Sequence, residues 1–211
     1  MLTDGALTGL AQQARRLLHS LGEPSLAPFL ADWPDLSDPR AAGSAIREGE
    51  SDTLPVLRCL PDFAADEPDF GAALVADLRR SHRLLTWRQT YTAGEIGDAF
   101  LQNYAYAEIV GTKSIPSRRI ACGFLILGPF TLYPRHHHEA EEIYIPLRGT
   151  ARWQQNDAVW RTRRPGAVIH HASGEPHSME TGAEPLLALY VWRSERLNQE
   201  ARLGGVRIDQ Q

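Results

Sequence analysis

The stretch that decides the fold is "PRHHHEAEEIYIPLRG", residues 134–149 of a chain of 211 residues. Histidine runs at chain termini are common as purification tags, but this run lies deep inside the chain and calls for a chemical reason. The residues of interest in it are, in order, His136, His137, His138, Glu142, Tyr144 and Gly149.

Successive side chains of an extended strand point to opposite faces. His136 and His138 are therefore expected to point the same way, and His137 the opposite way. If the extended backbone continues, Glu142 and Tyr144 share the parity of His136 and His138. All four side chains can then line one interior.

A second stretch, "RRPGAVIHHASGEPHSM", contains the tight turns Pro165-Gly166 and Gly174-Glu175-Pro176 and delivers His177 at the start of another strand. Two or three imidazoles with one carboxylate suit one divalent cation such as zinc, iron(II), manganese or nickel, and they leave positions open for a substrate. A bare histidine triplet is more often a solvated surface run. Glu142 and His177 in this order favour a catalytic metal site instead.

Composition narrows the class of protein. Residues are 43% hydrophobic and 23% charged, and the net charge of -4 offers no basic field for nucleic acid. No apolar run reaches the roughly 20 residues of a membrane span, and the N-terminus lacks the pattern of a secretory signal. The only cysteines, Cys59 and Cys122, suit a reducing compartment and exclude a thiolate zinc cluster. We expect a cytoplasmic protein without nucleic-acid or membrane partners.

Patterning divides the chain into a helical and a β part. Leucines from Leu7 to Leu21 recur with helical period and stop at Gly22, and a second helix is expected from Asp66. The capping box "TAGE" predicts a third helix from Thr92 to Gly111.

From about Lys113, six or seven short β-branched or aromatic runs alternate with turns, including a hairpin around Asn156 and Asp157. We expect a helical N-terminal extension over residues 1–112 packed on the barrel, a barrel over 113–195 and a tail over 196–211.

The spacing resembles the two cupin motifs. The first is a glycine, His-x-His, three residues, Glu, six residues and Gly, here His136, His138, Glu142 and Gly149, although its first glycine, Gly128, lies two residues farther from the histidines than usual. The second motif is matched by Pro165, Gly166, Gly174 and His177. This resemblance implies a mainly β fold, a cupin (double-stranded β-helix or jelly-roll barrel) holding one metal.

Within the cupins, the pattern resembles the dimethylsulfoniopropionate (DMSP) lyases, closest to the groups called DddQ and DddL. The likeness covers most of residues 92–195, with Tyr133 and Tyr144 beside the histidine motif and "LYVWR" at the end of the barrel. It implies that His138, Glu142 and His177 hold the metal, and His136 is a further candidate ligand. It also implies Tyr144 as metal neighbour or catalytic base, and Tyr133 as alternative base or substrate contact.

The residue types suit the β-elimination of this family. A metal can acidify the carbon beside the substrate carboxylate, and a nearby phenol can take its proton. The sulfonium is best held over aromatic faces, for which Tyr104, Tyr106 and Trp192 are the candidates.

Other functions remain open. A cupin dioxygenase or isomerase acting on another small carboxylate would use the same open metal positions, and a non-catalytic ligand-binding cupin would need the metal alone. Tyr144 favours the lyase over the binding protein, because a binding site needs no base beside its metal. A homodimer is compatible with the helical part, which is expected to serve as a lid or a dimerisation surface.

Overall fold

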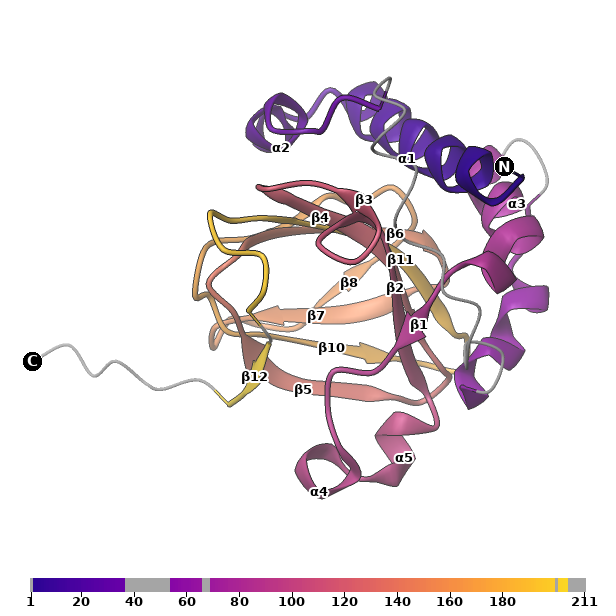
Figure 1. The fold of residues 1–211 in the computed structure, drawn as a ribbon. Helices are drawn as coiled ribbons and strands as arrows, with labels where there is room; N and C mark the ends of the chain where they lie inside the picture. Colours follow the sequence, from indigo (N-terminus) through magenta and orange to yellow (C-terminus); the bar gives the residue numbers. More distant parts are fainter. Residues whose placement is uncertain (1, 37–53, 66–68, 200, 205–211) are drawn as a thin grey trace, which may run out of the picture.

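The computed structural model describes residues 2–36, 54–65, 69–199 and 201–204. Helical elements come first, and strands dominate from Trp87 onward (Figure 1). The helical elements are α1 (Leu2–Leu21), η1 (Pro24–Leu26), α2 (Ala27–Ala31), η4 (Pro55–Asp62), α3 (Ala72–Ser81), η5 (His82–Leu84), α4 (Ala93–Ile96) and α5 (Asp98–Leu101). The strands are β1 (Trp87–Arg88), β2 (Tyr104–Gly111), β3 (Ile115–Pro116), β4 (Ile120–Leu127), β5 (Leu132–His137), β6 (Glu141–Arg148), β7 (Ala151–Gln155), β8 (Arg161–Arg163), β9 (Ile169–His171), β10 (His177–Thr181), β11 (Leu186–Arg193) and β12 (Arg202–Leu203).

Two sheets face each other and enclose the interior of a barrel. The larger has the strand order β1-β2-β4-β11-β6-β9 with β3 beside β2, and the smaller has the order β12-β5-β10-β7-β8. Apart from the β2–β3 pair, the pairings are antiparallel. The predicted mainly β barrel with helices at its N-terminal end is confirmed.

The larger sheet is buried on both faces, because successive side chains along its central strands belong in turn to two different hydrophobic clusters. Phe124 and Val191 belong to the cluster shared with the helices, whereas Leu125 and Tyr190 belong to the cluster inside the barrel. Figure 1 shows α1 and α3 against the outside of the larger sheet. The helices thus cover one face, and the other face is free to build a site.

The first helix and the hairpin agree with the sequence predictions. Helix α1 ends at Leu21 and is followed by Gly22 at φ +65°, a backbone conformation that glycine adopts without strain. Strands β7 and β8 pair across a turn in which Asn156 has φ +52°. Helix α3 runs over Ala72–Ser81, and the start predicted at Asp66 lies outside the described residues.

The helix predicted from Thr92 to Gly111 is wrong beyond Leu101. The capping box is present, with the Thr92 amide donating to Glu95 at 2.8 Å, but α4 ends at Ile96 before Gly97, which has φ +86°. After the short α5 the chain turns into β2, which pairs with β4 along most of its length. The capping box at Thr92 therefore starts only a short helix, and the residues of β2 form a strand because they pair with β4.

Strands β1 and β2 therefore join the larger sheet ahead of Lys113, where the sequence had placed the start of the barrel. The division near residue 112 stays a prediction, and we propose that these two strands be counted with the barrel. Over the described residues, no helix is long and apolar enough to cross a membrane.

Candidate metal centre

Three strands bring the predicted metal ligands together. His136 lies in β5 with His138 just beyond its end, Glu142 lies near the start of β6, and His177 opens β10, opposite His136. His136 and His138 are buried as predicted. His137 points the other way and its Nδ1 lies 2.8 Å from the Gly204 carbonyl oxygen.

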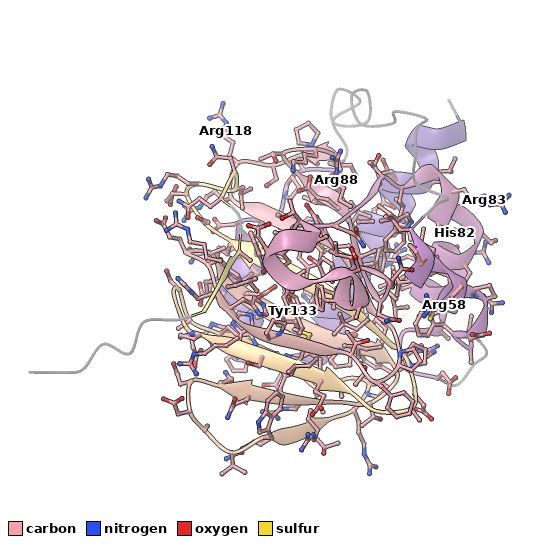
Figure 2. The ribbon with its side chains drawn as sticks, turned by 90° about the horizontal axis from the view of Figure 1, so that it is seen from below. Arg58, His82, Arg83, Arg88, Arg118 and Tyr133 are labelled. Carbon is pink, nitrogen blue, oxygen red and sulfur yellow. The ribbon has the colours of Figure 1, made fainter. Side chains whose placement is uncertain are left out.

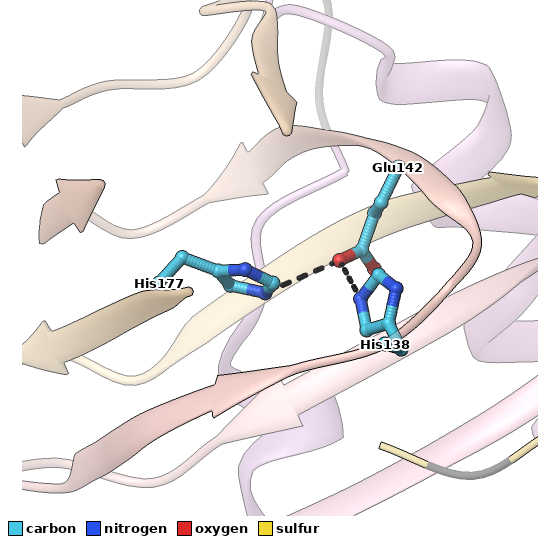
Figure 3. A group of neighbouring side chains, drawn as sticks. All are labelled: His138, Glu142 and His177. Carbon is cyan, nitrogen blue, oxygen red and sulfur yellow. Dashed lines mark hydrogen bonds and ion pairs between the residues drawn. The ribbon is translucent and has the colours of Figure 1, made fainter. Parts of the chain in front are cut away.

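Ligand atoms of His138, Glu142 and His177 all lie within 4.8 Å of one another (Figure 3). The two Nε2 atoms of His138 and His177 converge on the same Glu142 oxygen, Oε2, at 2.8 and 3.3 Å. All three side chains are almost completely withdrawn from solvent. Two imidazole nitrogens and a carboxylate oxygen therefore meet at one buried point.

Backbone carbonyls fix the orientation of both imidazoles. The Nδ1 atom of His138 lies 2.8 Å from the Ala140 oxygen, and that of His177 lies 2.9 Å from the Glu175 oxygen. A carbonyl only accepts, so Nδ1 carries a hydrogen in each ring and Nε2 is the nitrogen that faces the cluster. In the described part of the chain, His177 Nε2 has no hydrogen-bond partner. Two Nε2 atoms directed at one carboxylate oxygen can bind a divalent cation once both rings are neutral.

The charges of the cluster also favour a cation. Burial opposes ionisation of Glu142, yet the neighbouring His138 holds the pKa of this carboxyl well below its usual value. Burial lowers the pKa of His138, but the attraction of Glu142 outweighs it and the net shift is upward. A proton and a metal ion compete for the same place between these groups, so metal binding is expected to release a proton.

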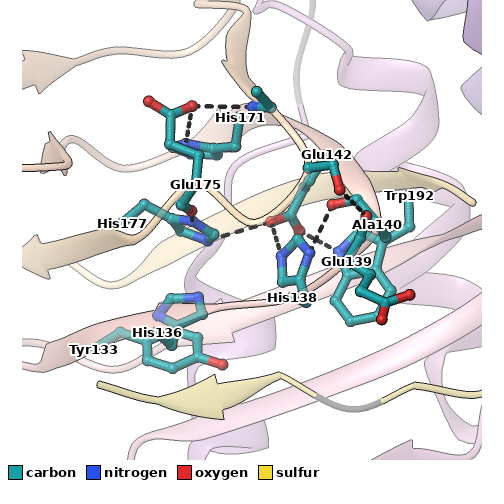
Figure 4. Close-up of polar contacts among 12 residues, drawn as sticks. Tyr133, His136, His138, Glu139, Ala140, Glu142, His171, Glu175, His177 and Trp192 are labelled. Atoms are coloured by element: carbon teal, nitrogen blue, oxygen red, sulfur yellow. Dashed lines mark hydrogen bonds and ion pairs between the residues drawn. The ribbon is translucent and has the colours of Figure 1, made fainter. Parts of the chain in front are cut away.

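Trp192 holds the glutamate from the far side. Its indole N–H donates to Glu142 Oε1 at 2.6 Å, and its ring lies 4.3 Å from the ring of His138 (Figure 4). Because the indole occupies Oε1, the other carboxylate oxygen, Oε2, faces His138 and His177. The residue predicted as a substrate contact does line the cavity, and it positions two of the proposed ligands as well.

His136 lies beside the cluster of three. Its ring is 4.1 Å from that of His177 and stacks on Tyr133 at 3.9 Å, while its Nδ1 faces the Pro134 oxygen at 2.8 Å. Burial lowers the pKa of His136 well below its usual value, so the ring is neutral. His171, behind His177, is buried and stacked on it at 3.9 Å, and burial lowers its pKa to about 2.

Tyr144 and Tyr133 are buried in the same cavity. Burial and the Glu142 charge raise the pKa of Tyr144 well above 10. Burial likewise raises the pKa of Tyr133, whose hydroxyl lies 3.0 Å from that of Tyr91. Figure 2 shows Tyr133 among the strands in the middle of the molecule, whereas Arg118 extends outward at its edge.

A cavity of about 160 Å³ adjoins the cluster. Tyr104 and Tyr106 both line it, although a regular helix would have turned only one of them inward. As alternate residues of β2 they share the interior face. Tyr190 of β11 adds a further phenol, with its ring 6.3 Å from that of Tyr106.

Several cavity residues were missed by the sequence analysis. Glu108 follows Tyr104 and Tyr106 at the same spacing of two, and this signal becomes visible once the segment is recognised as a strand. The contact between Tyr91 and Tyr133 joins residues 42 positions apart and has no local signal. The C-terminal segment also contributes lining residues, namely Leu197, Asn198, Gln199 and Ala201.

Comparison with known proteins shows the family to which the chain belongs. A sequence model described as dimethylsulfoniopropionate lyase matches residues 38–188, well over half of the chain. The DMSP lyase DddQ of Ruegeria pomeroyi is 30% identical over 198 residues, which covers 92% of both chains. The chain belongs to the DMSP lyase family.

Other members of this family support the assignment. DddL of Cereibacter sphaeroides, which carries the name of a DMSP lyase, is 38% identical over 120 residues, or 54% of this chain and 49% of that protein. The crystal structure of DddQ from Ruegeria pomeroyi superimposes with a TM-score of 0.77 at 26% identity, covering 95% of this chain and 96% of the other. A chain from a crystallographic study of the DMSP lyases RdDddP and RnDddQII gives 0.78 at 26% identity, with 96% and 99% covered.

These structural similarities extend beyond residues 92–195, to which the sequence resemblance was largely confined. With 95% or more of the chain covered, the helical N-terminal part is shared with the DMSP lyases as well as the barrel. The predicted cupin fold and the predicted family are confirmed.

Proposed function

We propose that this chain cleaves DMSP to dimethyl sulfide and acrylate, using one divalent metal ion held by His138, Glu142 and His177. The observation that supports this most directly is the convergence of two imidazole nitrogens and a carboxylate beside a phenol, Tyr144, in a cavity of small-molecule size. The nitrogen and oxygen donors suit zinc, iron(II), manganese or nickel. His136 is kept as a neighbouring candidate ligand.

A divalent ion in this position supplies Lewis-acid polarisation of the substrate carboxylate, which makes the adjacent carbon more acidic. Trp192 and the backbone carbonyls at Ala140 and Glu175 keep the ligand atoms aimed before the substrate arrives. Such preorganisation avoids the energetic cost of reorienting these groups during the reaction.

Tyr144 is proposed as the base. It shares the interior face of β6 with Glu142 and lines the same cavity, so we expect its phenol to reach the α-carbon of a substrate whose carboxylate is bound at the cluster. Tyr133 is proposed as a substrate contact or alternative base. It is the second choice as base because its hydroxyl already lies within hydrogen-bond distance of the Tyr91 hydroxyl. The aromatic faces of Tyr104, Tyr106 and Trp192 are proposed to contact the sulfonium end.

The proposed elimination accounts for every proton and electron pair without a further reactant. The phenolate of Tyr144 takes the proton of the α-carbon, and the C–H electron pair forms the double bond of acrylate. The carbon-sulfur bond breaks at the same time, and its electrons leave with sulfur as neutral dimethyl sulfide. The proton on Tyr144 must then return to solvent before the next turnover.

The test is the release of dimethyl sulfide from DMSP by the metal-loaded protein, compared with His138→Ala and His137→Ala. The first substitution removes a proposed ligand, and the second removes the outward-facing member of the same triplet. We expect activity to be lost in His138→Ala and retained in His137→Ala. Equal activity of the two variants would contradict the proposal.

Three further expectations belong to the same proposal. The unpaired, buried Cys59 and Cys122 favour a cytoplasmic location. The helical part is proposed to serve as a lid or a dimerisation surface, so a homodimer is the assembly to test by light scattering. The substrate is a small zwitterion or carboxylate, and the net charge of -4 argues against nucleic acid as a partner.

A further inference from the structure

One carboxylate lines the cavity without taking part in the metal cluster. Glu108 lies on β2 two residues after Tyr106 and four after Tyr104, and all three line the cavity. Alternation along the strand places them on the interior face. The cavity therefore contains two glutamates, Glu142 in the cluster and Glu108 apart from it.

A row of paired residues connects Glu108 with the metal side of the barrel. Glu108 pairs with Gly123, Gly123 pairs with Tyr190, and Tyr190 pairs with Tyr144 on four neighbouring strands. Neighbouring strands lie about 4.8 Å apart, so the three steps span about 14 Å of sheet. Tyr190 lies in this row between Glu108 and Tyr144, and Tyr144 is two residues from Glu142 on β6.

Gly123 leaves the middle of this row open. A Cβ atom at Gly123 would overlap the Ala107 carbonyl oxygen and would lie 2.8 Å from the hydroxyl of Tyr190. No side chain at Gly123 therefore separates Glu108 from Tyr190. The charge of Glu108 reaches that ring, since it is a cause, second to burial, of the raised pKa of Tyr190.

The Glu108 carboxylate is fixed through one oxygen. Its Oε1 accepts hydrogen bonds from the Lys113 amide at 2.6 Å and the Ser114 hydroxyl at 2.9 Å. Hydrogen bonds of this kind stabilise the ionised carboxylate. Among the residues that the structure describes, no hydrogen bond falls on Oε2, and no cationic side chain comes within 4.0 Å of it. Burial raises the pKa of Glu108 and outweighs these hydrogen bonds and the attraction of the Lys113 and Arg88 charges, so a cationic ligand beside Oε2 would favour the ionised carboxylate.

We propose that Glu108 binds the cationic sulfonium end of the substrate together with the rings of Tyr106 and Tyr190, and so selects substrates that carry a positive charge. The inference rests on the proposed function: with the substrate carboxylate at the metal cluster, its cationic end must lie elsewhere in the same cavity. A sulfonium carries no hydrogen to donate, so it is attracted only by opposite charge and by aromatic faces. Glu108 supplies the opposite charge, and Tyr106 and Tyr190 supply the aromatic faces.

The competing role for Glu108 is purely structural. Its bonds to Lys113 and Ser114 brace the turn between β2 and β3, and this bracing alone would explain a carboxylate at this position. Charge selection and bracing differ in one respect. Only charge selection depends on whether the ligand is cationic.

Two isosteric carboxylates separate the roles. The first, 3-(trimethylammonio)propanoate, carries a quaternary cation, and 4,4-dimethylpentanoate has an uncharged tert-butyl group of the same shape. Their dissociation constants for the metal-loaded protein are measured by calorimetry, which requires no turnover. The proteins compared are wild type, Glu108→Gln, Glu108→Asp and Ser114→Ala.

We expect the wild type to prefer the cation, and Glu108→Gln to lose roughly tenfold of that preference while binding the neutral ligand unchanged. The Gln amide oxygen can still accept both turn hydrogen bonds. Glu108→Asp retains the charge and should retain much of the preference, and Ser114→Ala, which weakens the turn alone, should retain it fully.

Equal weakening of both ligands in Glu108→Gln, or an unchanged preference, would overturn the proposal and leave Glu108 as a brace of the turn. Failure of the proposed function shows on a different readout, the absence of dimethyl sulfide from wild-type protein supplied with DMSP. The two failures are therefore distinguishable.

Discussion

Trp192→Phe is expected to weaken metal binding without removing any metal ligand. The substitution keeps an aromatic ring beside His138 but deletes the indole N–H that donates to Glu142 Oε1 at 2.6 Å. Glu142 is completely buried, so water does not replace the lost donor. A hydrogen bond to a charged group contributes about 1.5 to 3 kcal/mol. The dissociation constant for the metal should rise about ten- to a hundredfold, in line with the loss of a group that orients a ligand.

The assay is a competition titration of the metal-depleted protein with zinc(II) against a chelator of known affinity. Trp160→Phe is the matched control, because this half-buried tryptophan contacts Arg152 rather than the cluster. The control should bind zinc as the wild type does. If Trp192→Phe binds zinc within twofold of the wild type, the hydrogen bond does not orient Glu142 and the reasoning is refuted.

Further predictions concern the ligands and the base. His138→Ala and Glu142→Ala should each abolish the stoichiometric metal content found by elemental analysis, whereas His137→Ala should keep it; full occupancy in both ligand variants would disprove the ligand set. Tyr144→Phe should lose roughly 10²- to 10⁴-fold in kcat with its metal retained, and near wild-type turnover would move the base role to Tyr133. The wild-type rate should rise from neutral toward alkaline pH, because the base is a phenolate. Burial raises the pKa of Tyr144, and a bound cation opposes that rise; a rate that falls over this range would argue against a phenolate base.

The common face of the residues in the histidine motif could be predicted from sequence because it depends on short-range rules. Alternation along β5 and β6 sorts His136 and His138 from His137 and gives Glu142 and Tyr144 a common face. The turn before His177 contains Gly174 at φ +74°, a conformation that glycine adopts readily, and it returns the chain to the same interior. Local geometry gives the common face, whereas the meeting of His177 with His138 and Glu142 depends on the pairing of β10 with β5 and was implied by the resemblance to the cupin motifs.

The opposite wall of the cavity could not be predicted in the same way. The segment from Tyr104 to Gly111 follows a capping box formed by Thr92 and Glu95, which is a helix-start signal. It nevertheless forms a strand, because its backbone pairs with β4. Reading it as a helix separated Tyr104 from Tyr106 and concealed Glu108. Pairing between distant strands is a tertiary effect that propensity does not encode.

The contribution of the C-terminal segment to the cavity could not be predicted from sequence patterns either. Strand β12 pairs with β5, with Leu203 opposite His136 and Arg202 opposite His137. This pairing carries the residues just before it to the cavity, where Asn198 and Gln199 contribute to the lining. No periodicity in the sequence marks a two-residue strand of this kind.

The most direct test of the account is the product balance of the metal-depleted and metal-reloaded protein supplied with DMSP. Dimethyl sulfide is measured in the headspace gas and acrylate in solution, with zinc, iron(II), manganese and nickel each used for reloading. The account predicts equal amounts of the two products with at least one ion and neither product from the depleted protein. Acrylate and dimethyl sulfide in unequal amounts, their release at full rate without metal, or no release with any of the four ions would contradict it.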